Sequence, residues 1–137
     1  MTRHYPLYLT VPPNTPESMP VSADLTVEGA MLSRLHVLIP PGHCGLARLA
    51  VFYGNARIFP IEPGTWLRGD NQYLALDIRW PLPESRCTLT FKGWNEDDTY
   101  PHTFYMLVEV AEAVEEVQPW RLLSDFLSII KALMGIV

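Results

Sequence analysis

The sequence is short of charged residues, and its few cations are scattered. Only 18% of the 137 residues are charged, compared with roughly 25% in an average soluble domain. There are 10 Lys and Arg residues against 15 Asp and Glu residues, for a formal net charge of −5. Proteins that bind duplex nucleic acid cluster their cations along the phosphates, so we do not expect a nucleic-acid partner. A surface this poor in charge favours burial of part of it on a protein partner.

Cysteine is also scarce, with only Cys44 and Cys87 in the chain. Two cysteines are too few for a small domain framed by disulfides. The first residues, 1–7, include a cation but no long apolar stretch, so we expect no secretory signal and synthesis in a reducing cytoplasm. Both thiols are therefore expected to be free, without an essential disulfide.

No long uninterrupted apolar run is present. A membrane-spanning helix needs about 18 or more predominantly apolar residues. The most apolar segment, at the C-terminus, is interrupted by Arg121, Asp125 and Lys131, which argues against a membrane span. Contact of that segment with a membrane interface stays an open alternative.

No catalytic, metal or nucleotide motif stands out. His43 and Cys44 are adjacent in a loop-like Pro-Pro-Gly-His-Cys-Gly run, but nucleophilic catalysis needs groups that meet in space rather than in sequence. The histidines and cysteines lack the spacing of zinc ligands. The acidic run 95–98 lacks the pattern of a calcium loop and is predicted to be a solvated turn. We therefore expect a protein that is not an enzyme, with no catalytic residues, no metal and no cofactor.

Apolar and polar residues alternate over several segments, with the period of two that is typical of half-buried β-strands. The apolar phase of each segment is predicted to face a core. The residues expected there are Leu74, Leu76, Ile78, Leu89, Phe91, Phe104, Met106 and Val108. Two more continuously apolar runs, 31–39 and 46–53, are predicted to be central strands or strands covered on both faces. Segment 5–11 predicts an N-terminal edge strand.

Turn residues separate these segments. Pro and Gly gather at 12–14, 40–42 and 62–64, and Gly54-Asn55 between two apolar pairs predicts a tight hairpin. About eight short strands at this close spacing indicate an all-β sandwich or barrel. The predicted fold is mainly β: an antiparallel β-sandwich over residues 1–110, either jelly-roll-like or immunoglobulin-like.

The pattern changes after Val110. Residues 111–118 are acidic and are predicted to be a linker or a strand extension. Pro119 suits the first turn of a helix, predicted over 119–137, whose apolar residues exceed the arc of about 100° that one packing contact covers. We expect this helix to bind copies of the chain or a larger shell protein, with packing on its own sandwich as the alternative. The predicted interface residues are Trp120, Leu122, Leu123, Phe126, Leu127, Ile129, Ile130, Leu133, Met134, Ile136 and Val137.

Two stretches resemble a group of small β-sandwich proteins of tailed phages and phage-like regions. They are 38–46, Leu-Ile-Pro-Pro-Gly-His-Cys-Gly-Leu, and 94–103, Trp-Asn-Glu-Asp-Asp-Thr-Tyr-Pro-His-Thr. The resemblance covers about residues 5–110 and implies a virion structural role, as a capsid decoration or a fibre-associated protein. It transfers no catalytic residue, and the predicted helix after Val110 departs from the usual end of these proteins.

Two functions from different classes follow. The first is a non-enzymatic structural subunit of a virus-like particle, located in the virion and attached or oligomerised through its C-terminal helix. The alternative is a carbohydrate-binding or adhesion module, because Trp66, Trp80 and Trp94 at strand ends or loops could stack on sugars. The first predicts symmetric contacts in an assembly, and the second predicts exposed coplanar aromatic rings. A small hydrolase, which needs a pocket with converging His or carboxylate groups, ranks last.

Overall fold

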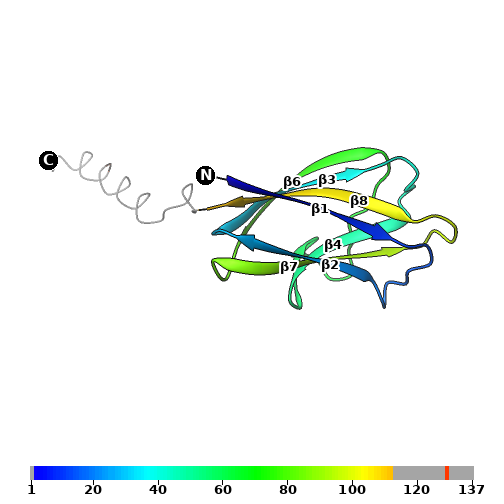
Figure 1. The fold of residues 1–137 in the computed structure, drawn as a ribbon, viewed down its shortest axis with the longest axis horizontal. Coiled ribbons are helices and arrows are strands. Elements are labelled where there is room, and N and C mark those ends of the chain that lie inside the picture. Colours follow the sequence, from blue (N-terminus) through cyan, green and yellow to red (C-terminus); the bar gives the residue numbers. More distant parts are fainter. Residues whose placement is uncertain (1, 113–128, 130–137) are drawn as a thin grey trace.

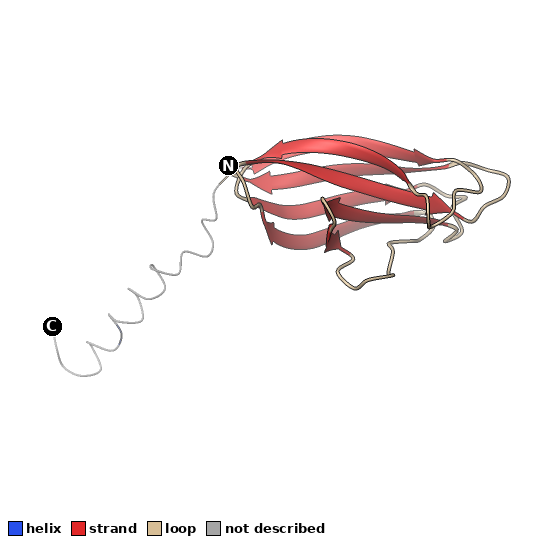
Figure 2. Ribbon diagram, turned by 90° about the horizontal axis from the view of Figure 1, so that it is seen from below, coloured by secondary structure: helices blue, strands red, loops and turns tan. Residues whose placement is uncertain are grey.

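The computed structural model describes residues 2–112 and residue 129, and residues 2–112 form two stacked four-stranded antiparallel sheets (Figures 1 and 2). The strands are β1 (Thr2–Val11), β2 (Val21–Glu28), β3 (Met31–Ile39), β4 (Ala47–Tyr53), β5 (Ala56–Phe59), β6 (Gln72–Pro81), β7 (Arg86–Asn95) and β8 (His102–Ala111). Sheet A has the order β1-β8-β3-β6, and sheet B has the order β2-β7-β4-β5. The predicted mainly β architecture of two packed antiparallel sheets is confirmed.

The strands pair as a long hairpin folded over on itself. β1 pairs with β8, β2 with β7, β3 with β6 and β4 with β5, always antiparallel. Each sheet is completed by one further pairing, β3 with β8 in sheet A and β4 with β7 in sheet B. The predicted N-terminal edge strand is β1, and the two more apolar runs are the central strands β3 and β4. Gly54-Asn55 makes the predicted hairpin, with Tyr53 paired to Ala56.

The core lies between the sheets, and the alternation predicted its phase correctly. The predicted core residues that are buried are Leu89, Phe91, Phe104, Met106 and Val108. The other three, Leu74, Leu76 and Ile78, are partly buried and pack against the same cluster. They are less enclosed because they lie on β6, an edge strand of sheet A.

The outer face of sheet B is covered by aromatic and cationic side chains. Ala50 and Phe52 point away from the core, yet they are only 1% and 9% exposed. The chain after β5 pairs with β4 through Leu67, which brings Trp66 over this face. The Arg57 guanidinium lies 5.1 Å from the ring centres of both Phe52 and Trp66. The strand β4 is therefore covered on both faces, whereas β3 is not.

The predicted helix over 119–137 and most of the predicted linker lie outside the described residues. Among the predicted interface residues, Ile129 is described, and its side chain is 59% exposed. The helix and its interface role stay predictions. Thr2 pairs with Ala111, so the chain leaves the sandwich at the end where it enters (Figure 1). Within the described residues, no helix is long and apolar enough to cross a membrane.

Candidate functional site

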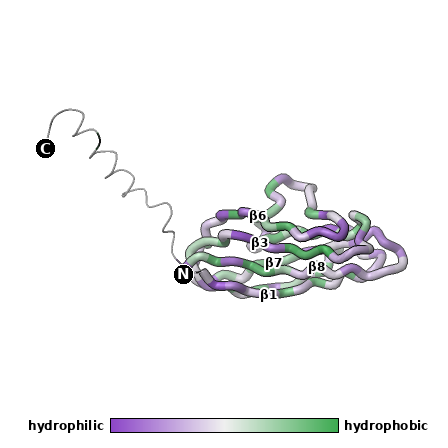
Figure 3. Tube along the Cα trace, turned by 90° about the horizontal axis from the view of Figure 1, so that it is seen from above, coloured by the Kyte–Doolittle hydropathy of each residue, from purple (hydrophilic) through white to green (hydrophobic). Residues whose placement is uncertain are grey.

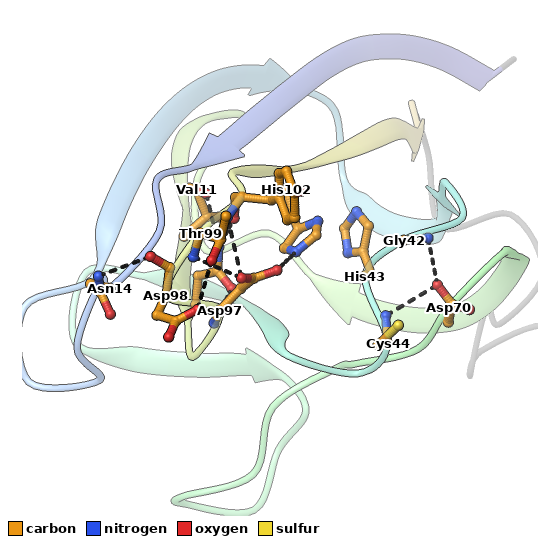
Figure 4. Close-up of polar contacts among 12 residues, drawn as sticks. Val11, Asn14, Gly42, His43, Cys44, Asp70, Asp97, Asp98, Thr99 and His102 are labelled. Carbon is orange, nitrogen blue, oxygen red and sulfur yellow. Dashed lines mark hydrogen bonds and ion pairs between the residues drawn. The ribbon is translucent and has the colours of Figure 1, made fainter.

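His43 lies beside His102, which pairs with Val11 at the end of the sandwich opposite to Thr2, where the chain enters. Figure 4 shows the two histidine rings next to each other. His43 lies in the loop between β3 and β4, as predicted, but it is only 2% exposed. Its Nε2 donates a hydrogen bond to the carbonyl oxygen of Thr103, at 3.0 Å. Its ring packs against the rings of His102 and Phe104, with centroids 4.6 and 4.9 Å away. His43 therefore fills the space beneath its own loop.

His102, the first residue of β8, is the neighbour of His43 and is 7% exposed. Its Nε2 lies 2.8 Å from Oδ2 of Asp97. The same carboxylate accepts the backbone N–H groups of Thr99 and Tyr100. The hydrogen bond from Thr99, followed by the one from His102, lowers the pKa of Asp97. Asp97 is thus held as a carboxylate that orients the His102 ring.

Asn95, at the end of β7, ties three segments together and is 1% exposed. Its Nδ2 donates to the carbonyl oxygens of Val11 and Tyr100, and its Oδ1 accepts the N–H of Asp97. The predicted solvated turn is present, with Glu96 and Asp98 exposed and Asp97 partly exposed. Asn95 itself is the last residue of β7 and is buried, because β1 and the turn after β7 close over it.

Asp70, in the loop before β6, holds the His43 loop from its other side. Its Oδ1 accepts the N–H of Gly42 at 2.9 Å and that of Cys44 at 3.1 Å. The hydrogen bond from Cys44 is the largest cause that lowers the pKa of Asp70. Cys44 has a φ of 48°, a left-handed conformation that costs free energy in a residue with a side chain. The Asp70 contact supports that conformation.

This cluster does not assemble a nucleophile with a base. His102 and Asp97 form the base and orienting half of a triad, but within residues 2–112 neither His43 nor His102 hydrogen-bonds to a Cys or Ser side chain. Cys44 is an exposed free thiol and Cys87 a buried one, so the two are not disulfide-bonded. In the described part of the chain, no group of three or more His, Cys, Asp or Glu side chains is placed to hold a metal ion. Within the described residues, the two histidines make ring packing and hydrogen-bond contacts that hold this end of the sandwich together.

Acidification is expected to destabilise the protein through His43. Burial, and then the charge of neighbouring His102, lowers the pKa of His43. Its Nδ1 is buried and has no hydrogen-bond partner among the described residues. In the unfolded chain His43 has the ordinary pKa of about 6.5, so it binds a proton as the pH falls below that value. In the folded protein its pKa is lower, so it is still neutral at the same pH. Stability therefore falls as the pH drops from about 6.5 toward the lower folded pKa. Urea unfolding at a series of pH values measures this loss.

A matched pair of variants isolates the contribution of His43. His43→Gln keeps a side-chain N–H for the Thr103 carbonyl but does not titrate, so its stability should change less between about pH 7.5 and 5.5. Phe91→Ala is the control, because it destabilises the buried core without removing a titratable group, and it should keep the wild-type pH dependence. An unchanged pH dependence in His43→Gln would contradict the role of His43.

The second candidate site is the outer face of sheet A, where β6, β3, β8 and β1 lie side by side (Figure 3). The strand register places four side chains in one row across the sheet, in the order Tyr8, Tyr105, Leu38 and Tyr73. In the same order these side chains are 67%, 49%, 49% and 62% exposed. We call this set the tyrosine row. The largest exposed apolar patch of a protein is often functional, so this row is a candidate interaction surface.

Two further rows run parallel to the tyrosine row. The middle row, two residues along each strand, consists of Pro6, Leu107, His36 and Ala75. The charged row, two residues further, consists of His4, Glu109, Arg34 and Asp77. Within the charged row, His4 lies 3.0 Å from Glu109, and Arg34 lies 3.0 Å from Asp77. The face therefore changes from apolar to charged along the strands.

A shallow hollow of about 420 Å³ lies where the tyrosine row meets the middle row. Tyr73, Tyr105 and Leu38 line it together with His36 and Glu109. The rings of His36 and Tyr73 are stacked, with centroids 5.8 Å apart and planes at 4°, and the Tyr73 hydroxyl hydrogen-bonds to Nδ1 of His36. This pair gives the hollow a fixed aromatic wall.

The alternation in the sequence already indicated that this face is unusual, but the prediction of the core considered only the inward phase of each strand. Tyr73, Tyr105 and Leu107 stand in the outward phase of strands whose other phase packs on the core, partly buried in β6 and buried in β8. Polar residues are expected in that phase when it faces water. Large apolar and aromatic residues at these positions depart from that expectation and make this face a candidate contact surface.

Trp66, Trp80 and Trp94, which could stack on sugars in the alternative function, lie in different surroundings. Trp80 is partly buried against the core. Trp66 and Trp94 meet edge to face on sheet B, at 87° and 6.0 Å between ring centroids. The Arg48 guanidinium lies 4.5 Å above the Trp94 ring. They therefore do not form a coplanar aromatic platform.

Comparisons with known proteins do not assign a family. No protein-family model and no curated protein matches the sequence. Among solved structures, the crystal structure of FLHE is 11% identical, with a TM-score of 0.38, and the match covers 80% of this chain and 97% of that one. A likeness this weak carries no argument about function.

Proposed function

We propose that this chain is a non-enzymatic structural subunit of a virus-like particle, as a capsid decoration or a fibre-associated protein. The order of its strands carries the proposal. The pairs β4–β5, β3–β6, β2–β7 and β1–β8 are nested, and the resulting long hairpin is rolled into two sheets. Eight strands wound in this way make a jelly roll, an architecture of viral capsid and lectin domains. Of the two sandwich types that the sequence favours, we propose the jelly roll.

The surface of the sandwich supports a role in assembly. The tyrosine row and the middle row present a face without Asp, Glu, Lys or Arg across all four strands of sheet A. Only 18% of the whole chain is charged, and exposed apolar patches of this kind mark sites of protein contact. The resemblance of 38–46 and 94–103 to phage β-sandwich proteins supports the same function. The location that goes with it is the virion.

Isolation of particles from a culture that makes the protein tests this function. We expect the chain to sediment with the particles in a fixed ratio to a larger shell protein. A Tyr105→Glu variant should be depleted from the particles, because it places a charge in the centre of the tyrosine row. An Arg86→Glu variant, on the opposite sheet, should be retained. Recovery of the wild-type chain in the unassembled fraction alone would rule out the proposal.

Deletion of residues 118–137 is expected to leave a folded sandwich that assembles less well. The deletion removes none of the eight described strands, because β8 ends at Ala111. Exposed Leu or Ile side chains each forgo roughly 1.5–3 kcal/mol relative to full burial, so the apolar segment favours contact with a partner. Circular dichroism reports the fold, and sedimentation velocity reports the assembled mass. Equal assembly by the full and shortened chains would show that the segment has another role.

A carbohydrate-binding module is the second candidate function, because lectins also use jelly rolls. The stacked rings of His36 and Tyr73 and the nearby ring of Tyr105 would offer an aromatic surface to a sugar. Against this, the rings of Tyr8 and Tyr105 are tilted by 38°, so they do not form one flat platform. Binding on a glycan array that is lost in Tyr73→Ala would favour this function over the structural one.

A further inference from the structure

We propose that the outer face of sheet A binds the same face of a second copy of this chain, about a two-fold axis parallel to the strands. The axis runs between β8 and β3, the two central strands of the sheet. The tyrosine, middle and charged rows together form the contact. The proposed dimer needs no other component, and it therefore goes beyond the role in a particle.

The charged row is complementary to itself under this axis. From β1 to β6 it reads His4, Glu109, Arg34 and Asp77. The axis keeps each row at the same level along the strands and reverses the order of the strands, so β8 of one copy faces β3 of the other and β1 faces β6. Each Glu109 then faces an Arg34, and each His4 faces an Asp77. Complementary charges of this kind set the register of an interface.

The tyrosine row matches itself in the same way. Tyr105 faces Leu38 of the second copy, and both are 49% exposed. Tyr8, 67% exposed, faces Tyr73, 62% exposed. Packed sheets lie about 10 Å apart, which leaves room for one interdigitated layer of such side chains. The middle row lies between the other two, so the centre of the contact stays apolar and the charges lie toward its edge.

Other orientations of the axis lose this match. A two-fold axis that runs across the strands would reverse the level of the rows and set the charged row against the tyrosine row. Glu109 and Arg34 would then be desolvated by apolar side chains without an opposite charge from the second copy, which costs free energy. The charge pattern therefore selects the axis along the strands.

The size of the face predicts a weak dimer. Four strands about 4.8 Å apart and three rows about 6.8 Å apart make a face on the order of 400 Å². A standard stable interface buries about 800 Å² on each partner. The three rows thus supply about half of the usual area, and a further contact is needed for a tight complex.

The remaining chain starts in a position to supply that contact. The axis keeps the strand direction, so both copies end β8 at Ala111 at the same end of the dimer. One strand spacing and one sheet spacing separate the two β8 strands, on the order of 11 Å. Packed helices lie 8–10 Å apart. Residues 113–137 of both copies therefore begin close enough to associate, as predicted for the apolar segment.

Exchange of charges between Glu109 and Arg34 tests the dimer in the full-length chain. Sedimentation equilibrium should show a concentration-dependent dimer of the wild type. In the Glu109→Arg dimer two pairs of arginines face each other, and in the Arg34→Glu dimer two pairs of glutamates do. Because like charges repel, each variant should raise the dimer Kd roughly 100-fold. An equimolar mixture of the two variants should dimerise again, because every facing pair is then opposite in charge. Native mass spectrometry identifies the mixed dimer.

Arg86→Glu is the matched control, because it makes the same charge change on β7 in sheet B, where the Arg86 side chain is 72% exposed. It should leave the dimer Kd unchanged, and circular dichroism should show that all variants are folded. A monomeric wild type at every concentration overturns the proposal. A dimer whose Kd is unaffected by the charge reversals also overturns it, as does an equimolar mixture of the two folded variants that does not dimerise.

These outcomes separate the dimer from the proposed role in a particle. The chain could sediment with particles while its dimerisation is unaffected by the Glu109 and Arg34 variants. That result would disprove the proposed dimer and leave the proposed role in a particle standing. A dimer that responds to both reversals in a protein that never enters particles would do the opposite.

Discussion

Replacement of Phe91 by alanine is expected to lower the free energy of unfolding by about 3–5 kcal/mol. Phe91 is fully buried in the middle of β7. It is paired with Ala23 on β2 and with Val51 on β4, so strands on both sides hold the site open. The loss combines the transfer of a large apolar side chain to water with the cavity that the surrounding strands cannot fill. Urea unfolding followed by tryptophan fluorescence measures it.

Tyr105→Ala provides the control for this prediction. It removes an aromatic ring from a strand in the same sandwich, but Tyr105 is 49% exposed on the outer face of sheet A. Its effect on the stability of the monomer should be below about 1 kcal/mol. A similar small effect for Phe91→Ala would mean that the phase of β7 is wrong.

Replacement of Asn95 by leucine is expected to destabilise the protein by about 2–4 kcal/mol, although leucine has a similar volume. The change leaves the carbonyl oxygens of Val11 and Tyr100 and the N–H of Asp97 without their present partner. A buried polar group left unpaired costs about 1–3 kcal/mol. Asn95 is 1% exposed and its bond to Val11 is buried, so water has little access there. The bonds with Tyr100 and Asp97 are part-buried, so water offsets part of their loss. Denaturant unfolding at neutral pH measures the total loss in the free energy of unfolding.

Asn55→Leu is the matched control, because Asn55 is exposed in the turn between β4 and β5. The same chemical change there leaves no buried polar group unpaired, so it should cost only about 1 kcal/mol or less, from the loss of a favoured turn residue. Amide hydrogen exchange adds a local measurement. In Asn95→Leu the N–H groups around 97–100 should exchange faster, and equal exchange rates in the two variants would count against the role of Asn95.

The alternation of apolar and polar residues determined which side of each strand faces the core. Phe91, Phe104 and Val108 are fully buried as expected, because side chains on a strand alternate between its two faces whatever its partners are. The hairpin at Gly54-Asn55 was also predictable, because a tight turn depends on the residues within it. Both are local properties, and local properties can be read from the order of residues.

Contacts between distant segments were decided by the tertiary structure. The turn at 96–98 is exposed as expected, but Asn95 beside it is buried, because the end of β1 passes over it and accepts its hydrogen bond at Val11. His43 was expected in a loop, which is correct, but its burial beside His102 depends on a contact across 59 residues of sequence. Nothing in the neighbourhood of either residue in the sequence encodes these contacts.

The tyrosine row on the surface also combines a local property, which the sequence indicated, with a set of neighbours that the tertiary structure decided. The sequence placed Tyr73 and Tyr105 in the outward phase of their strands, and their exposure follows from that phase. Their position in one row with Leu38 depends on the pairing of β3 with both β6 and β8. Strand pairing joins segments tens of residues apart, and many pairings satisfy the same alternation. Local sequence therefore determined the face of each residue, and the fold as a whole determined its neighbours on that face.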